Sequence, residues 1–336
     1  MKIKRLVAVF VARNKEFLRD RSALAWNILF PVLIVAGFAF AFSGNTSDQF
    51  KVALYQDAGQ QQAAGGGFLK TKYVQFLPTD DLQKTITKVE RHQVDMLIDR
   101  NGKRYWINTS SPKGYVLERI LWSSDGDTFT RAAVSGDEIR YVDWLLPGIL
   151  GMNMMFSALF GVGYVLVRYR KNGVLKRLKA TPLSAVEFLA AQIGSRLIVI
   201  MSIVVIVYFG TDLFVSFAMY GSYINLFLIF ALGAISLISL GLLIASRTAS
   251  EEFAGGILNL VSWPMMFLSG VWFSLEGVHP WVQKLALMFP LTHVTNAARS
   301  IMIDGASLAQ LSTEITTLLA MSAVFLLAGA LSFKWE

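Results

Sequence analysis

The chain contains no cysteine and only three histidines. Without cysteine, a disulfide, a thiolate metal site and a cysteine nucleophile are excluded. His92, His279 and His293 stand far apart, and none has a partner at metal-ligand spacing. No Gly-x-Ser-x-Gly elbow is present either. We therefore expect no metal site and no catalytic residue, which disfavours a membrane-bound enzyme.

Charge is also scarce, because only 16% of the 336 residues are charged while 54% are hydrophobic. A soluble domain usually has about a quarter charged residues. The net charge of +8 does not indicate nucleic acid, since the basic residues form no stripe interleaved with stacking aromatics. A Walker A loop, Gly-x-x-x-x-Gly-Lys-Ser/Thr, is missing, so the chain has no such site for ATP phosphates.

Long apolar runs are abundant instead. A bilayer core of about 30 Å requires about 20 apolar helical residues. The first run is too long and begins too late for a cleavable signal peptide, so we expect it to remain as a span. The sequence predicts a polytopic α-helical membrane protein with six transmembrane helices: Ala23–Phe42, Trp144–Val167, Val186–Phe209, Tyr223–Ala245, Ala254–Phe273 and Ile315–Phe333. As domain boundaries, we assign residues 22–43 to the first transmembrane helix and residues 143–336 to helices 2–6.

Basic residues in the short loops predict the orientation. The loop 168–184 has six basic side chains and no acidic one, and residues 1–21 are also rich in Lys and Arg. The loop Gly210–Ser222 has neither Lys nor Arg. Because Lys and Arg are retained in cytoplasmic loops, we expect both chain ends and the 168–184 loop in the cytoplasm.

The polar insert at residues 44–142 predicts a small extracytoplasmic α/β domain. Apolar alternation and turn residues predict a hairpin closed by a type I′ turn at Asn101-Gly102, and Thr79 is the expected N-cap of a helix. The expected strands are Val52–Tyr55, Tyr73–Leu77, Val94–Asp99 and Lys103–Asn108, and the expected helices are Asp80–Gln93 and Pro112–Trp122.

Two cytoplasmic segments have amphipathic patterns. Residues 1–21 predict an elbow helix in the membrane interface, either a plain anchor or a contact for a cytoplasmic partner. Its candidate residues are Phe10, Arg13, Phe17, Arg19 and Arg21. In the second segment, Val174, Leu175 and Leu178 lie among basic residues and favour a short helix at residues 172–180. The alternative for this loop is a simple positively charged connector.

Polar residues inside the spans are candidates for a translocation path, because hydrocarbon penalises them unless they face protein or water. These are Asn153, Asn259 and Ser262, with Pro264 as an expected kink. Ordinary helix packing is the alternative for each. Arg196 is expected to snorkel or to pair with Glu187. Glu276, His279 and His293 could form an outer gate or an interfacial turn.

Several motifs occur in order along the chain. They are Arg19-Asp-Arg21 with Pro31, Asp143-Trp-Leu-Leu-Pro-Gly148, the loop Gly173–Ser184, and the closing series Ser262–Glu276, His279–Gln283 and Phe289–His293. Together they resemble the permease subunits of type-2 ABC exporters, in the subgroup with a large extracytoplasmic domain. The chain differs from many such permeases in having Arg170 and Lys171 where Glu is common, and Ser274 where Pro is common.

The resemblance implies a bacterial inner-membrane protein that exports a hydrophobic or amphiphilic molecule, drug-like or lipid. It implies two copies of a separate ABC ATPase that bind ATP and Mg, and no cofactor in this chain. A second permease copy, identical or a close paralogue, is also implied, and the extracytoplasmic domain would either shield the exit or recruit an outer partner. Residues 275–300 would form an outer re-entrant turn, and the 172–180 helix would couple to the ATPase. The implied coupling residues are Gly173, Leu175, Lys176, Arg177, Leu178, Thr181, Pro182 and Leu183.

Two other classes of function remain open from sequence. An extracytoplasmic ligand sensor or scaffold would use the insert for binding, but such proteins usually have a cytoplasmic signalling domain, and little polar sequence lies on the inner side. An ion-coupled carrier would need carboxylates within the spans, and none lies securely in mid-membrane.

Overall fold

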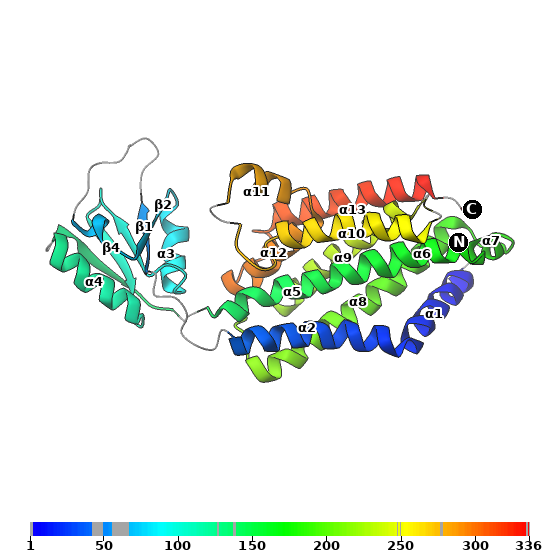
Figure 1. Cartoon of the computed structure of the whole chain (residues 1–336), viewed down its shortest axis with the longest axis horizontal. Helices are drawn as coiled ribbons and strands as arrows, with labels where there is room; N and C mark the ends of the chain where they lie inside the picture. Colours follow the sequence, from blue (N-terminus) through cyan, green and yellow to red (C-terminus); the bar gives the residue numbers. More distant parts are fainter. Residues whose placement is uncertain are drawn as a thin grey trace. The chain divides into compact units, whose positions relative to one another are not determined.

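The computed structural model describes residues 3–41, 50–55, 67–125, 128–136, 139–246, 248, 250–275, 278–333 and 335. Two compact units divide the chain, one formed by Met1–Ala41 with Tyr141–Glu336 and the other by Phe42–Arg140. We refer to them as the helical unit and the sheet unit (Figure 1).

The sheet unit is built on five strands in the order β2-β1-β3-β4-β5. Pairing is parallel except between β3 and β4, which form the predicted hairpin. The edge strand β2 contains Pro78, which an edge tolerates because one side of it makes no ladder bonds. The elements are β1 (Phe50–Tyr55), the 3-10 turn η1 (Gly67–Lys70), β2 (Val74–Thr79), α3 (Leu82–Glu90), β3 (Met96–Asp99), β4 (Arg104–Asn108), α4 (Pro112–Asp125) and β5 (Thr130–Val134).

Alternating side chains give this sheet two packed faces, with α3 and α4 on opposite sides (Figure 1). On the α4 face, Leu117 and Leu121 pack in one cluster with Met96 and Ile98. On the α3 face, Val89 packs in a second cluster with Leu97 of β3 and Trp106 of β4. The sheet unit therefore has an apolar core on each side of the sheet.

Two local predictions for this unit are wrong. The hairpin turn has four residues rather than two, because Asp99 pairs with Arg104 and its Oδ1 accepts hydrogen bonds from the N–H groups of Asn101 and Gly102, each at 3.0 Å. A type I′ turn would need positive φ at both of those residues, and instead Lys103 has φ 48°. Thr79 is not the N-cap, since α3 begins at Leu82 and the Asp81 carbonyl accepts from Thr85 N–H at 3.2 Å.

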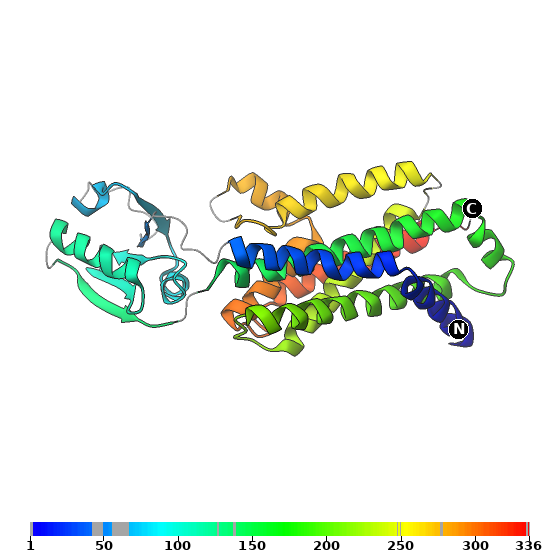
Figure 2. The ribbon, with the colours of Figure 1, turned by 60° about the horizontal axis from the view of Figure 1, so that its bottom comes forward.

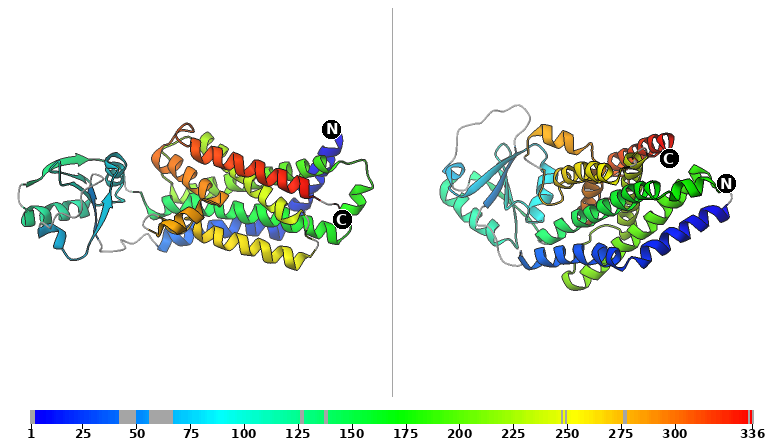
Figure 3. Two further views of the ribbon diagram at one scale, coloured as in Figure 1. Left: turned by 90° about the horizontal axis from the view of Figure 1, so that it is seen from above. Right: turned by 45° about the vertical axis from the view of Figure 1, so that its right-hand side comes forward.

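The helical unit consists of helices that run side by side (Figures 1 and 3). Its elements are α1 (Ile3–Arg19), α2 (Arg21–Ala41), α5 (Tyr141–Ala158), the π-helical segment η3 (Leu159–Tyr164), α6 (Val165–Lys171), α7 (Val174–Lys179), α8 (Ala185–Val215), α9 (Tyr223–Ala245), α10 (Glu251–Leu268), α11 (Pro280–Ala286), α12 (Pro290–Asp304) and α13 (Ser312–Ser332).

Among the described residues, four helical segments are long and apolar enough to cross a membrane: Tyr141–Lys171, Ala185–Val215, Tyr223–Ala245 and Ser312–Ser332. Asn27–Phe38, within α2, is a shorter apolar stretch. The helix α10, which contains most of the fifth predicted span, has two charged residues in its first turn, Glu251 and Glu252. The chain is thus a mostly helical membrane protein.

One end of the helical unit gathers the segments that the sequence predicts to be cytoplasmic. There α1 turns away from the direction of α2, and it lies at the same end as α7 and the last turn of α13 (Figures 1 and 2). The start of α8 is fixed by a capping box in which Ser184 Oγ accepts from Glu187 N–H at 3.2 Å and Glu187 Oε2 accepts from Ser184 N–H at 3.0 Å. This cap positions the exit from the α7 loop.

Candidate functional site

The basic loop forms a helix shorter than predicted, Val174–Lys179 instead of 172–180. Gly173 precedes it with φ 68°, a left-handed conformation that glycine adopts without steric cost and that redirects the chain between α6 and α7. After the helix, the Thr181 hydroxyl donates to the Leu178 carbonyl at 2.6 Å. Both Thr181 and Pro182 are exposed, and Leu183 is half-buried.

Burial separates the two leucines of α7. Leu175 is completely buried within the chain, while Leu178 is half-buried. The expectation that Leu175 contacts a partner is therefore wrong, because its side chain anchors α7 to the helical unit. Lys176, Arg177 and Lys179 are exposed. The accessible side chains of α7 are therefore the half-buried Val174 and Leu178 and these three cations.

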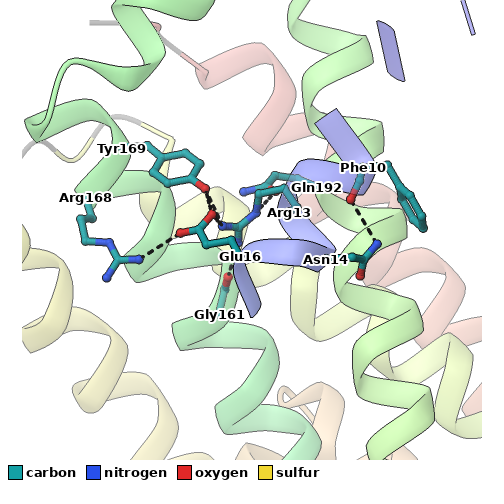
Figure 4. Close-up of polar contacts among 8 residues, drawn as sticks. All are labelled: Phe10, Arg13, Asn14, Glu16, Gly161, Arg168, Tyr169 and Gln192. Atoms are coloured by element: carbon teal, nitrogen blue, oxygen red, sulfur yellow. Dashed lines mark hydrogen bonds and ion pairs between the residues drawn. The ribbon is translucent and has the colours of Figure 1, made fainter. Parts of the chain in front are cut away.

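The elbow helix α1 packs against α8, and its Arg13 joins three segments (Figure 4). The Arg13 guanidinium donates to Gln192 Oε1 on α8 at 2.6 Å and to the Tyr169 hydroxyl on α6 at 2.6 Å. It also donates to the Gly161 carbonyl on η3 at 3.4 Å. Arg13 therefore fixes α1 to the helices on both sides of the α7 loop.

Glu16 supplies the carboxylate of this cluster (Figure 4). Its carboxylate accepts hydrogen bonds from Arg13 at 2.7 Å, from Arg168 at 3.3 Å and from the Tyr169 hydroxyl. Glu16 was not among the functional residues predicted from sequence. The available signal was composition, because Glu16 and Asp20 are the only acidic residues in the first 21 positions.

The remaining predicted elbow residues lie in different surroundings. Phe10 is half-buried near Gly194 on α8, and the Arg196 guanidinium lies 5.2 Å from the ring centre of Phe17. Arg19 and Arg21 are exposed at the junction of α1 and α2. Four apolar side chains of α1, those of Ile3, Val7, Val11 and Leu18, are exposed.

At the other side of the loop base, Arg170 caps the C-terminal end of α9. Its guanidinium donates to the carbonyls of Ala245 at 2.9 Å and Ser246 at 2.8 Å, and also to that of Thr248. A cation at this place satisfies carbonyls that have no partner within the helix and suits the helix dipole. Many of the permeases that the chain resembles have Glu near position 170. The basic residue at this position thus has a structural explanation.

Contacts with α10 complete the base of the loop. Lys171 Nζ lies 3.8 Å from Glu251 Oε1, and the Tyr164 hydroxyl donates to Glu251 Oε2 at 3.0 Å. Residues 164–171 are therefore tied to α1, α9 and α10 by side-chain contacts. This segment leads directly into the α7 loop.

The candidate path residues do not form one group. Asn153 Nδ2 donates to the Asn27 carbonyl of α2 at 3.0 Å, whereas Asn259 Nδ2 donates to the Gly255 carbonyl of its own helix at 2.9 Å. Ser262 is fully buried. Asn259 and Pro264 are exposed on α10.

The proposed outer gate is also divided. Glu276 lies outside the described residues. The His279 ring caps α11 by accepting from Trp281 N–H at 3.3 Å. His293 is buried, with Nε2 2.9 Å from the Leu287 carbonyl. His279 and His293 thus both have contacts that stabilise local structure.

A cavity of about 360 Å³ lies in the helical unit. Arg196 is buried at its wall and donates to the Ser157 carbonyl and hydroxyl, at 2.5 to 2.8 Å. The predicted pairing with Glu187 is wrong, since Ser157 on α5 is the partner and Glu187 closes the cap of α8. The lining residues are Asn27, Phe30, Met152, Asn153, Phe156, Ser157, Phe160, Gly161 and Arg196.

These features define a polytopic helical membrane protein whose basic loop is fixed to an amphipathic N-terminal helix. The family model described as ABC-2 family transporter protein matches residues 21–331. The chain belongs to this family.

Relatives from Escherichia coli K12 agree with that membership. The inner membrane transport permease YhhJ is 28% identical over 189 residues, which cover 54% of this chain, and the chain spans about half of YhhJ, 49% of its length. The probable multidrug ABC transporter permease YbhS is 21% identical over 369 residues, covering 98% of this chain and 94% of YbhS. The probable multidrug ABC transporter permease YbhR is 23% identical over 187 residues, covering 55% and 50%.

Proposed function

We propose that this chain is the permease subunit of an ATP-driven exporter that moves a hydrophobic or amphiphilic molecule, drug-like or lipid, outward across the membrane. The observation that carries the proposal is the basic α7 loop, whose base is tied to α1, α9 and α10. Because the sequence has no Walker A loop, ATP and Mg would be bound by a separate ABC ATPase and not by this chain.

The proposed assembly contains two permease copies, identical or close paralogues, and two ATPase subunits. Each permease would cross a bacterial inner membrane six times, with both ends in the cytoplasm and residues 44–142 outside as an α/β domain that meets an outer partner. The basic residues of the tail and loop support this orientation. The exposed apolar side chains of α1, such as Ile3, Val7 and Leu18, fit a helix that contacts lipid.

In the proposed mechanism, α7 docks in a groove of the ATPase through Leu178. Lys176, Arg177 and Lys179 would pair with acidic groups at the rim of that groove. ATP binding would draw the two ATPase subunits together and move α7. Arg13 and Glu16 would transmit the movement to α1, Arg170 to α9 and Glu251 to α10, so that the helices shift between inward- and outward-facing states.

The translocation path in this proposal lies between the two copies. Asn259 and Pro264, exposed on α10 in the single chain, would face that path or the second copy, and Ser262 would pack behind them. Asn153 lines the cavity described above and would contribute a polar group on another face. His279 and His293 would hold the outer turn in shape rather than move as a gate.

The test is affinity purification of the tagged full chain from detergent-solubilised native membranes, followed by mass spectrometry. We expect an ABC ATPase at a stoichiometry of one per permease. Its reproducible absence, with a signalling protein in its place, would contradict the exporter and favour a sensor or scaffold. Absence of any partner would favour an ion-coupled carrier.

A further inference from the structure

The cavity beside Arg196 combines one buried cation with apolar walls. Four large side chains, Phe30, Met152, Phe156 and Phe160, form most of its apolar lining. Its volume of about 360 Å³ falls within the range of small-molecule sites, roughly 300–1,000 Å³. Phe30 is 41% exposed, so the cavity reaches the surface of the single chain at that side chain.

The charge of Arg196 has no carboxylate partner among the described residues. Its hydrogen bonds run from Nε and Nη2 to Ser157, and the ring of Phe17 also lies close to it. The carbonyl, hydroxyl and ring are all neutral groups. A guanidinium stays protonated in proteins, and a buried charge is costly unless it is paired. The cavity wall therefore has a positive charge without a negative one.

The geometry leaves one edge of the guanidinium available. None of the described hydrogen bonds of Arg196 uses Nη1. Gly161 lies directly against the group, since a Cβ atom there would overlap the guanidinium. The π-helical segment η3 places this glycine at the wall, and π-helical turns occur frequently at functional sites. The backbone thus makes room for Arg196 at the cavity.

We propose that this cavity binds an anionic amphiphile. The negative headgroup, a carboxylate, phosphate or sulfonate, pairs with Nη1 of Arg196, and the hydrocarbon packs against Phe30, Phe156 and Phe160. A neutral apolar molecule would fill the same space but leave the cation unpaired. The limited volume holds the headgroup and the first part of a chain, and the remainder extends past Phe30. The proposal concerns binding alone and does not require the exporter function.

The site also connects with the coupling contacts. Arg13 donates to the carbonyl of Gly161, and Phe17 covers one side of Arg196. Both belong to α1, which Figure 4 shows between α6 and α8. A headgroup bound at Arg196 therefore lies next to the helix that is tied to the base of the α7 loop.

The experiment uses the full chain in nanodiscs of zwitterionic phosphatidylcholine. The probe is 11-(dansylamino)undecanoic acid, whose fluorescence rises in an apolar site, and its methyl ester is the neutral control. We expect the acid to bind at least tenfold more tightly than the ester. Arg196→Gln should remove this preference, whereas Lys284→Gln, which removes an exposed cation away from the cavity, should keep it.

A second variant covers the case in which Arg196→Gln fails to fold. Gly161→Ala keeps the charge but displaces the guanidinium, so it should weaken binding of the acid several-fold and leave the ester unchanged. Equal binding of acid and ester, or an acid preference that survives displacement of the guanidinium, would overturn the proposal.

The source of the amphiphile is assigned by a competition arm. Nanodiscs that contain phosphatidylglycerol test whether an anionic membrane lipid displaces the acid. Displacement supports the site and identifies the membrane as the source of its ligand. Retained binding of the acid, still dependent on Arg196, supports the site and identifies a free amphiphile.

Discussion

Arg170→Gln should loosen the C-terminal end of α9 without unfolding the protein. The guanidinium donates to the carbonyls of Ala245 and Ser246 at 2.9 and 2.8 Å, and to that of Thr248. Glutamine is shorter and neutral, so it cannot bridge these carbonyls or interact with the negative end of the helix dipole.

The magnitude follows from the bonds that are lost. A hydrogen bond to a charged group contributes about 1.5–3 kcal/mol, and a cation at a helix C-terminus adds about 0.3–1 kcal/mol. Water near the helix end replaces part of this, because loop carbonyls there can be hydrated. We therefore expect a local destabilisation of about 3 kcal/mol, which corresponds to roughly 100-fold faster opening.

Hydrogen exchange measured by mass spectrometry on the full chain detects such local opening. Amides at residues 241–246 should exchange roughly 100-fold faster in Arg170→Gln, at the rate ratio derived above. Arg168→Gln is the matched control, because Arg168 pairs with Glu16 where both side chains are about half exposed, and such pairs contribute about 0–1 kcal/mol. Unchanged exchange at these amides in folded Arg170→Gln would refute the capping role.

Three further predictions concern the loop, the elbow helix and the sheet unit. Leu178→Asp should leave membrane insertion intact and reduce co-purification of the ATPase, whereas Leu175→Asp should disrupt the loop itself, because Leu175 is fully buried; an unchanged ATPase yield with Leu178→Asp would contradict the docking role. Glu16→Gln leaves two guanidinium groups without their carboxylate, so the rate of amide exchange in α1 should rise about tenfold. An unchanged rate would show that Glu16 does not hold α1 in place. Burial raises the pKa of Asp95 above 3.8, so the folded sheet unit binds this proton more tightly than the unfolded chain and loses stability as pH rises through the raised pKa. Asp95→Asn should remove that loss, as measured by urea unfolding of the full chain at pH 4 and pH 7 with exchange of the sheet-unit peptides as the readout, and an identical pH dependence would refute this explanation.

Local patterns in the sequence were sufficient for the regular elements. The span predicted at Tyr223–Ala245 coincides with α9 at both ends, because hydropathy changes sharply there. The β3–β4 hairpin was also predicted, since alternating apolar residues flank Asn101 and Gly102. Both features depend on residues close together in the sequence.

Features that depend on distant segments were not predicted. The short strand β5 was not predicted, and it is defined by parallel pairing with β4. Arg196 was assigned to the wrong partner because Ser157 lies 39 positions away in the sequence. The contact between Glu16 and Tyr169 joins residues 153 positions apart. Such side-chain pairings arise from helix packing and have no local sequence signature.

The central claim is that α7 docks on an ATPase, and site-specific photocrosslinking in native membranes tests it most directly. A benzophenone amino acid would replace Arg177, which is exposed on α7, and in a control chain Tyr73, which is 79% exposed in the sheet unit. We predict that position 177 crosslinks to an ATP-binding subunit and that position 73 does not. Crosslinks from position 177 only to lipid or to an unrelated protein would contradict the account.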